Sequence, residues 1–329
     1  MSSIWGHNLK ISLFGESHGP AIGVTLDGLP PGEEIDFEKI KTHLARRAPG
    51  NHISDTPRRE PDEVEILSGV YNNKTTGTPL AAIIRNRDVR SGDYAELVAR
   101  PRPGHADITG ALRYNHFNDP RGGGHFSGRL TAPLTFAGGV CLQILEHRGI
   151  QINARVFEIG DVEIARKEGD SVGGMVECLA TGIPAGIGNP IFGNVESRVA
   201  SILFAIPAVK GVEFGAGFGV AKMRGSESND APYFDGAGNL QRRTNHAGGI
   251  EGGITNGMPL VVRCAFKPTP SIAREQDTVN LVTRQNDVIK IKGRHDVCIV
   301  PRAVVVVESA VAVALLDLDP QMTQIAKKK

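Results

Sequence analysis

The chain has few cysteines, few aromatic residues, almost no net charge and no long apolar run. Its 329 residues include four cysteines and one tryptophan, and 37 Lys and Arg stand against 36 Asp and Glu, for a formal net charge of +1. Because the cysteines stand singly, without C-x-x-C spacing, a disulfide framework or a zinc site is disfavoured and a reducing cytoplasm is expected. A near-neutral chain also argues against a nucleic acid or a membrane surface as partner.

Neither end of the chain nor its apolar segments indicate a membrane protein. Residues 1–8 lack the apolar stretch of a signal peptide. The longest apolar run, residues 303–316, is interrupted by Glu308 and Ser309 and is too short to cross a bilayer, so it predicts a buried helix. The ten histidines form no H-x-H or H-x-x-x-H pair, and no metal is expected.

The chain is rich in arginine, glycine and proline. It contains 24 Arg and only 13 Lys, and the planar guanidinium fork suits fixed recognition of carboxylates and phosphates. Glycine and proline together make 60 of the 329 residues and fall between apolar runs. This placement predicts tight turns and close backbone approaches.

Short motifs of the first half return in the second half in the same order. Residues 28–32 are echoed by 182–186, 64–66 by 212–214, 76–80 by 256–260, and a histidine close before an acid occurs at 105 and at 295. We therefore expect a single domain over 1–329 built from two pseudo-repeats, about 1–150 and 151–329.

Each half has short β-type runs and two kinds of helix. Strands are expected over 9–14, 22–26, 64–70 and 80–85, an amphipathic helix from Asp36 to just before Pro49, and an apolar helix over about 133–147. In the second half Asn194 is expected to cap a helix. The turns between adjacent strands are too short for βαβ crossovers, so the fold class is α/β with largely antiparallel hairpins covered by helices.

The spacing of the repeats places about 32 extra residues in the second half. Most are the polar stretch 225–245, which is too long for a bare connection. Two interpretations stay open, a disordered surface insertion and a mobile lid over a site.

The segment 15–19 matches the G-x-S-x-G pattern of a serine-hydrolase nucleophile elbow. That elbow needs a helix immediately after the serine, whereas residues 20–26 alternate as a second strand. The alternatives are a glycine-bounded turn with an incidental Ser17 and His18, or a turn that presents both to a ligand.

A triple-glycine segment, residues 121–129, is flanked by Arg121 and Arg129. Its backbone N–H groups precede a helix, where anions bind readily, so it predicts a phosphate or carboxylate site unless it is a plain helix-entry turn. Segments 267–271 and 293–296 add further cations, hydroxyls and a carboxylate. The G-x-G-x-G run at 215–219 lacks the spacing and the helix of a dinucleotide site.

Taken together, these motifs resemble the chorismate synthase family. They occur in that family's order at 14–19, 102–107, 121–124, 245–249, 267–269 and 293–296. The resemblance implies a lyase of the shikimate pathway, in which 5-enolpyruvylshikimate 3-phosphate loses phosphate and a ring hydrogen by 1,4-anti elimination to give chorismate. It also implies reduced FMN without net redox change, NADPH as a candidate flavin reductant, and a β-α-β sandwich with pseudo-twofold symmetry assembled as a cytoplasmic homotetramer.

The resemblance also implies roles for individual residues. His18 matches a position near the substrate phosphate and His105 one near flavin N1, while Ser17 and Asp296 match a pair that relays a proton at flavin N5. Three arginines match contacts to substrate anions: Arg47, Arg129 and Arg294. The positions that match flavin-lining residues are His125, Phe126, Ser127, Pro207, Ala208, Gly252, Lys267, Pro268, Thr269, Pro270, Ser271 and Arg294.

The chain departs from the family pattern after the triple glycine. Many members carry an arginine and a serine where this chain has His125 and Phe126, which leaves the local flavin contacts open. Two further hypotheses therefore stand beside the lyase. One is a serine hydrolase built on Ser17, and the other is a catalytically silent module that binds flavin or phosphate.

Overall fold

Two antiparallel sheets dominate the computed structural model, which describes residues 3–50, 61–87, 96–291 and 296–318. The first sheet has the order β1-β2-β3-β7-β4, with β1 (Ile4–Trp5), β2 (Lys10–Gly15), β3 (Ala21–Asp27), β7 (Leu80–Arg85) and β4 (Val64–Ser68). The second has the order β10-β15-β9-β8, with β10 (Val209–Phe214), β15 (Leu260–Phe266), β9 (Gly174–Thr181) and β8 (Gln151–Ile159). Neighbouring strands pair antiparallel throughout, which confirms the predicted hairpins.

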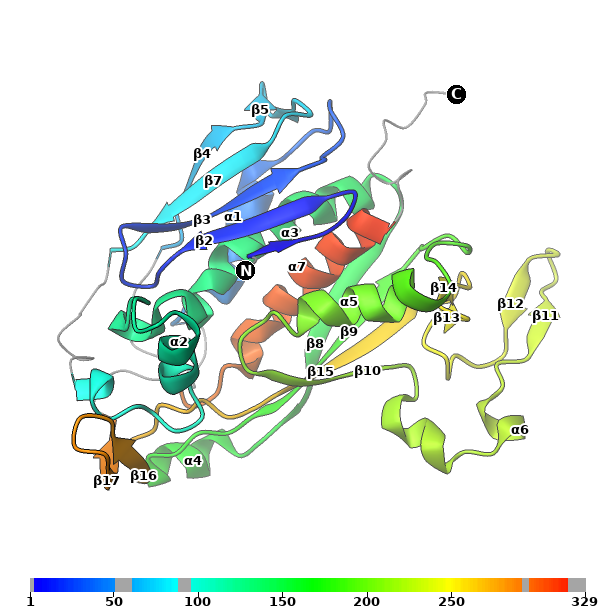
Figure 1. The fold of residues 1–329 in the computed structure, drawn as a ribbon. Helices are drawn as coiled ribbons and strands as arrows, with labels where there is room; N and C mark the ends of the chain where they lie inside the picture. The colour runs from blue at the N-terminus through cyan, green and yellow to red at the C-terminus, as the bar shows by residue number, and fades with distance from the viewer. Residues whose placement is uncertain (1–2, 51–60, 88–95, 292–295, 319–329) are drawn as a thin grey trace.

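A layer of helices lies between the two sheets (Figure 1). It consists of α1 (Phe37–Arg47), α3 (Thr131–Glu146), α5 (Val195–Leu203) and α7 (Val300–Leu318). Helix α7 contacts α1, α3, α5 and strands β8 and β9, whereas α3 contacts β2, β3 and β7. The main hydrophobic core runs through this layer. The architecture is the expected β-α-β sandwich.

Shorter elements surround the sandwich. They are the helices α2 (Asp107–Arg113), α4 (Val162–Glu168) and α6 (Gly225–Ser228), the two-stranded ribbons β5 (Val70–Tyr71) with β6 (Lys74–Thr75), β11 (Pro232–Phe234) with β12 (Leu240–Arg242), β13 (Ile250–Glu251) with β14 (Ile254–Thr255) and β16 (Glu275–Asn280) with β17 (Gln285–Lys290), and the 3₁₀ turns Arg121–Phe126, Gly128–Leu130, Ile191–Gly193 and Gly217–Lys222.

The two sheets repeat one topology. The order β2-β3-β7-β4 corresponds to β8-β9-β15-β10, with α1 and α5 after the second strand of each set and α3 and α7 after the third. The repeated glycine-proline loops, 28–32 and 182–186, are each held by an equivalent hydrogen bond. The Thr75 hydroxyl donates to the Pro30 carbonyl, and the Thr255 hydroxyl donates to the Pro184 carbonyl, at 2.6 Å in both cases. The fold is therefore internally duplicated, and the boundary near residue 150 stays a prediction.

The ends of the helices follow the local sequence signals. The Asp36 carboxylate caps α1 by accepting from the backbone N–H groups of Glu38 and Lys39, and Asn194 caps α5 through the N–H of Ser197. One predicted element was wrong in extent. The strand expected over 64–70 ends at Ser68 because Gly69 takes φ +84° beside the backbone of Leu80, and the chain turns there into β5.

The two apolar helices of the core approach each other closely. A Cβ on Gly138 of α3 would lie 2.1 Å from the Cβ of Ser309 on α7, so this crossing requires glycine. The run around Ser309 is buried on all sides, as its sequence predicts. None of the described helices combines the length and the apolarity that a membrane span requires.

The polar stretch 225–245 is folded. It contains α6 and the hairpin β11–β12, which extend away from the sandwich (Figure 1). The interpretation of this stretch as disordered was therefore wrong. Of the described residues, none between 225 and 245 lines the cavity described below, so the lid interpretation gains no support.

Candidate functional site

A cavity of about 890 Å³ lies at one end of the helix layer. Its lining comes from both sheets, from the glycine-rich turns before α3, and from the segments 202–210, 266–271 and 296–306. Thr131 and Leu134 bring the N-terminal end of α3 to the cavity, and Arg302 and Ala303 bring that of α7. Because a helix N-terminus carries a partial positive charge, two such ends favour an anionic occupant.

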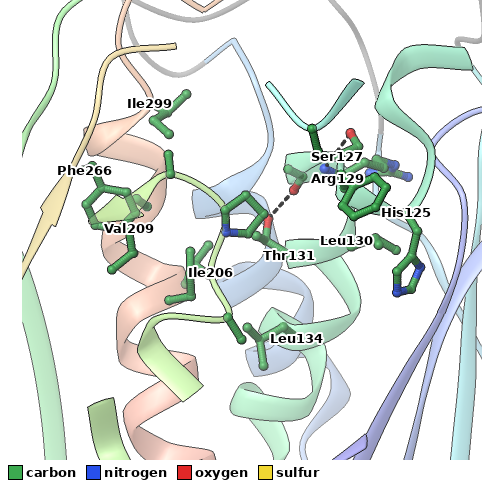
Figure 2. Close-up of a pocket in the computed structure, with 18 of the residues that line it drawn as sticks. His125, Ser127, Arg129, Leu130, Thr131, Leu134, Ile206, Val209, Phe266 and Ile299 are labelled. Carbon is green, nitrogen blue, oxygen red and sulfur yellow. Dashed lines mark hydrogen bonds between the residues drawn. The ribbon is translucent and has the colours of Figure 1, made fainter. Parts of the chain in front are cut away.

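One wall of the cavity is apolar. Leu134, Ile206, Val209, Phe266 and Ile299 surround the space in Figure 2, with His125, Ser127 and Arg129 on the opposite side. An apolar wall facing polar groups suits a ligand that has an aromatic ring and charged substituents.

Two buried arginines share one buried carboxylate on the polar side. Arg47 donates from Nε to Asp62 Oδ2 at 3.0 Å and also from Nη2, and Arg129 Nη1 donates to Asp62 Oδ1. Burial alone would raise the pKa of Asp62, but Arg47 and Arg129 outweigh burial and hold this pKa below its usual value. Two cations against one carboxylate leave this corner positively charged.

A second carboxylate organises the turn that carries His105. Asp107 Oδ2 accepts from the backbone N–H and the Nε of Arg102, both at 2.9 Å, and Oδ1 accepts from Arg102 Nη2 and from His105 Nδ1, both at 2.7 Å. Burial would raise the pKa of Asp107, but its hydrogen bonds with Arg102 and His105 hold it far below the usual range. Asp107 is therefore a carboxylate at neutral pH.

The triple-glycine turn separates the two cavity histidines. All three glycines have positive φ, and a Cβ on Gly122 would lie 2.0 Å from His18 Nδ1, while one on Gly123 would lie 2.9 Å from His105 Cε1. Only glycine allows this backbone to pass between the two rings.

Ser17 lies in the turn between β2 and β3, with His18 next to it. Its hydroxyl is 3.2 Å from His18 Nδ1 and donates to the Arg121 carbonyl at 3.4 Å, and the residue is fully buried. A strand, and no helix, follows this turn. The G-x-S-x-G segment therefore lacks the geometry of a nucleophile elbow.

The departures from the family pattern have their own contacts. His125 donates from Nδ1 to the Gly15 carbonyl at 2.9 Å, which leaves Nε2 to accept from the Ser3 hydroxyl at 2.9 Å. Phe126 packs beside Tyr114, with ring centroids 6.2 Å apart, and both rings line the cavity. His125 and Phe126 thus form this part of the cavity wall in place of the family's arginine and serine.

The segment 267–271 brings a cation and hydroxyls to the cavity. Lys267 donates from Nζ to the Gly104 carbonyl at 3.0 Å, and burial together with nearby Lys210 lowers the pKa of Lys267. Ser271 Oγ accepts from Arg102 Nη1 at 3.3 Å. These groups form a second cationic corner beside the apolar wall.

Asp296 lines the cavity next to the start of α7. Arg302 Nη1 donates to both of its carboxylate oxygens, at 2.9 and 3.0 Å, and Arg302 Nε donates to the Arg47 carbonyl at 2.9 Å. The Thr269 hydroxyl donates to the Asp296 carbonyl at 2.8 Å. Arg302 thus ties Asp296 to the helix that carries Arg47.

The structure brings most of the predicted residues to one cavity. Those that line it are His18, Arg47, His105, His125, Phe126, Ser127, Arg129, Pro207, Ala208, Lys267, Thr269, Pro270, Ser271 and Asp296. Among the described residues Ser17, Pro268 and Gly252 do not line it, and Arg294 lies outside the described residues.

Sequence reasoning missed three residues that organise the site. Asp107 belongs to the motif 102–107, and Asp62 lies two residues before the repeat segment 64–66. A carboxylate close to several arginines in the sequence is the signal that points to both residues. Arg302, at the start of an apolar helix, gives no such signal. In the described part of the chain, no three His, Cys, Asp or Glu side chains come together as a metal site.

Comparisons with known proteins agree in their result. The family model described as chorismate synthase matches residues 9–167 and 160–319. The chorismate synthase of Korarchaeum cryptofilum (strain OPF8) is 46% identical over 348 residues, covering 95% of this chain and 96% of the relative. That of Thermococcus kodakarensis is 48% identical over 342 residues, with 95% and 96% covered. A solved structure titled "Crystal Structure of Chorismate Synthase" matches with a TM-score of 0.73 and 29% identity, covering 95% of this chain and 92% of that one.

Proposed function

Because this chain belongs to the chorismate synthase family, whose function in the shikimate pathway it shares, we propose that its cavity binds 5-enolpyruvylshikimate 3-phosphate together with reduced FMN. The chain is a lyase by its family. The substrate carries a phosphate and two carboxylates, and elimination of the phosphate with a ring hydrogen gives chorismate. The observation that carries the proposal is the pair of buried arginines, Arg47 and Arg129, held at the cavity by one carboxylate.

The residues present fit a flavin. An isoalloxazine ring needs an apolar surface, and Val209 and Phe266 belong to such a wall. A ribityl phosphate needs a cation and hydroxyl donors, which Lys267, Thr269 and Ser271 supply at the same cavity. When bound, reduced FMN would supply electron density while the phosphate leaves, with no net redox change.

The chain's own residues then bind and position the substrate. Arg47 and Arg129 bind substrate anions without rearranging, because Asp62 already holds them. His18, on the turn before β3, donates to the departing phosphate, and His105 presents Nε2 toward the flavin edge. Asp296, together with Ser17, would hold and relay a proton on the N5 side of the flavin, and Ser17 reaches the cavity through His18. The role carried over for Arg294 remains part of this proposal.

We propose further that the enzyme is a cytoplasmic homotetramer. The four cysteines are free thiols, as in a reducing compartment. Four phenylalanines are unusually exposed, with 93% of Phe192, 92% of Phe117, 81% of Phe218 and 74% of Phe234 accessible. Gly252 lies outside its own chain's cavity, so a flavin contact at Gly252 requires a second copy. The molar mass of the protein by light scattering tests the assembly.

An anaerobic assay tests the function. The protein is mixed with 5-enolpyruvylshikimate 3-phosphate and with chemically reduced FMN, with oxidised FMN or with no flavin, and both chorismate and phosphate are measured. We expect the two products in equal amounts with reduced FMN alone. A protein that binds FMN but releases no phosphate would favour the silent flavin-binding module.

The source of the electrons is a separate question. We propose NADPH as the reductant that keeps FMN in its reduced form. The test follows the absorbance of protein-bound FMN after NADPH is added without air. Bleaching supports the proposal, and unchanged absorbance means that an external reductase supplies the electrons.

A further inference from the structure

We propose that Asp107 is a positioning residue that keeps a proton on Nδ1 of His105, so that Nε2 is the nitrogen that gains and loses a proton in the cavity. This inference rests on the role proposed for His105 above. Asp107 is not one of the residues that the family resemblance matches to substrate or flavin. It is also absent from the described residues that line the cavity.

Two neighbours compete for Nδ1 of His105. Asp107 Oδ1 lies 2.7 Å away and needs a hydrogen on Nδ1, whereas Arg102 Nη2 lies 3.1 Å away and needs a lone pair there. An arginine has no acceptor and a carboxylate has no donor, so each neighbour selects one tautomer. Arg102 Nη2 already donates to Asp107 Oδ1 at 2.7 Å, and the shorter contact assigns the proton to Nδ1.

The position of Asp107 is itself fixed. It is the first residue of α2, and its other oxygen accepts from the backbone N–H and the Nε of Arg102. The turn from 102 to 105 is closed by a hydrogen bond from the His105 N–H to the Arg102 carbonyl at 3.4 Å. The carboxylate therefore cannot swing away from the imidazole without breaking the turn.

His105 lines the cavity, and Nε2 is the ring nitrogen that contacts neither Asp107 nor Arg102 by a hydrogen bond. The ring packs against Gly123 of the glycine turn, and a Cβ there would lie 3.2 Å from Nε2. Nε2 makes no hydrogen bond to the part of the chain that the structure describes. With Nδ1 held as a donor, Nε2 accepts a hydrogen bond when the ring is neutral and donates one when the ring is charged.

Removal of the negative charge should reverse the tautomer. In Asp107→Asn the amide has one hydrogen-bond-accepting oxygen, whereas the carboxylate has two. Arg102 Nη2 then remains as the partner for Nδ1, and the proton moves to Nε2. A neutral imidazole that already carries its proton on Nε2 cannot take up a second proton at Nε2. Proton transfer at the cavity is therefore lost.

The first test measures the tautomer directly. Protein labelled with [¹⁵N]histidine is examined by solid-state NMR without ligand, and the His105 resonances are identified by their loss in His105→Ala. We expect a protonated Nδ1 and an unprotonated Nε2 in the wild type, and the reverse in Asp107→Asn. A wild-type ring with its proton on Nε2 would overturn the proposal. This readout needs no turnover, so failure of the proposed function would not affect it.

The second test is a double-mutant cycle on kcat. Asp107→Asn should lower kcat by about 10- to 100-fold in the wild type, no more than His105→Ala itself does, because the residue acts through His105. In the His105→Ala background the same substitution should lower kcat by less than about threefold. Equal losses in both backgrounds would overturn the proposal and make Asp107 a structural residue. The control is Glu177→Gln, which also removes a carboxylate between two cations, Arg155 and Arg263, but on strand β9 away from the cavity. Its kcat should equal that of the wild type.

Discussion

At the residue scale, single carboxylates arrange the cations of the cavity in groups. Asp62 holds Arg47 and Arg129, and Asp107 holds Arg102 and His105. A cation held in this way loses little conformational entropy when an anion arrives, and its geometry is set before binding. The excess of arginine over lysine in the composition is explained in part by these groups.

The first prediction concerns His105. In His105→Ala we expect folding and FMN affinity to be kept and kcat to fall by about 10- to 1000-fold, the range for a lost general acid or base. Anaerobic kinetics with reduced FMN measure kcat, and flavin titration measures the affinity. An unchanged kcat would remove His105 from the mechanism.

The second prediction concerns Arg129. Arg129→Ala removes one charged donor to the substrate, so its KM should rise by about 10- to 100-fold, as expected for a lost hydrogen bond between charged groups. Arg85→Ala serves as control, because Arg85 is an exposed arginine paired with Glu65 on the first sheet. If both variants saturate like the wild type, Arg129 has a structural role only.

The sequence could reveal a site residue where that residue stands inside a recognisable motif. His18, His105 and Lys267 stand in runs of glycine, proline and polar residues, where a packing role is a poor explanation, and their family resemblance is specific. Arg302 could not be found, because it stands in the first turn of an apolar helix and belongs to none of the motifs, although its partner Asp296 lies only six residues earlier. Gly252 matched the family pattern, yet it does not line the cavity of its own chain, which the sequence alone could not reveal.

At the element scale, most boundaries follow from local signals. Asp36 and Asn194 start their helices as caps, and Gly149 takes φ +79° just beyond α3. The break at Gly69 was missed because its cause is distant in sequence, the backbone of Leu80 on the neighbouring strand. Local sequence therefore predicts where an element begins more reliably than where a neighbour interrupts it.

The third prediction compares two adjacent glycines of α3. Gly138→Ala would place a Cβ 2.3 Å from the Cα of Ser309 and should lower the free energy of unfolding by about 1–3 kcal/mol or more. Gly139→Ala would place a Cβ whose nearest neighbours are His43 and Ile40, at 3.5 Å, and should raise that free energy by up to about 1 kcal/mol through helix propensity. Urea unfolding of both variants measures the difference. Equal effects would contradict the close crossing of α3 and α7.

At the scale of the whole molecule, the duplicated halves meet in a buried polar contact. His43 of α1 donates from Nε2 to the Ser309 hydroxyl of α7 at 2.9 Å, since that hydroxyl itself donates to the Val305 carbonyl. Beside it, Arg46 donates to both oxygens of Glu308. The contact joins a helix of the first half to one of the second.

The fourth prediction is a pH dependence of stability. Burial lowers the pKa of His43 from 6.5 to about 4, so the unfolded chain binds a proton at a higher pH than the folded protein does. The stability that depends on neutral His43 is intact above about pH 6.5 and is lost as the pH falls toward about 4, by roughly 3 kcal/mol.

Urea unfolding of the wild type and of His43→Gln measures this effect. Glutamine can still donate to Ser309 but does not titrate, so the variant should lose less stability than the wild type between about pH 7.5 and about pH 4.5. The difference between the two proteins isolates His43 from the carboxylates that titrate in the same range. Parallel curves would show that His43 is not buried in the folded protein.

The proposed function requires that one cavity holds both substrate and flavin. A crystal structure with 5-enolpyruvylshikimate 3-phosphate and oxidised FMN, which does not support turnover, would show both ligands in place. We expect the substrate anions on Arg47 and Arg129 and the flavin ring against the wall that includes Val209 and Phe266. Either ligand bound outside this cavity would contradict it.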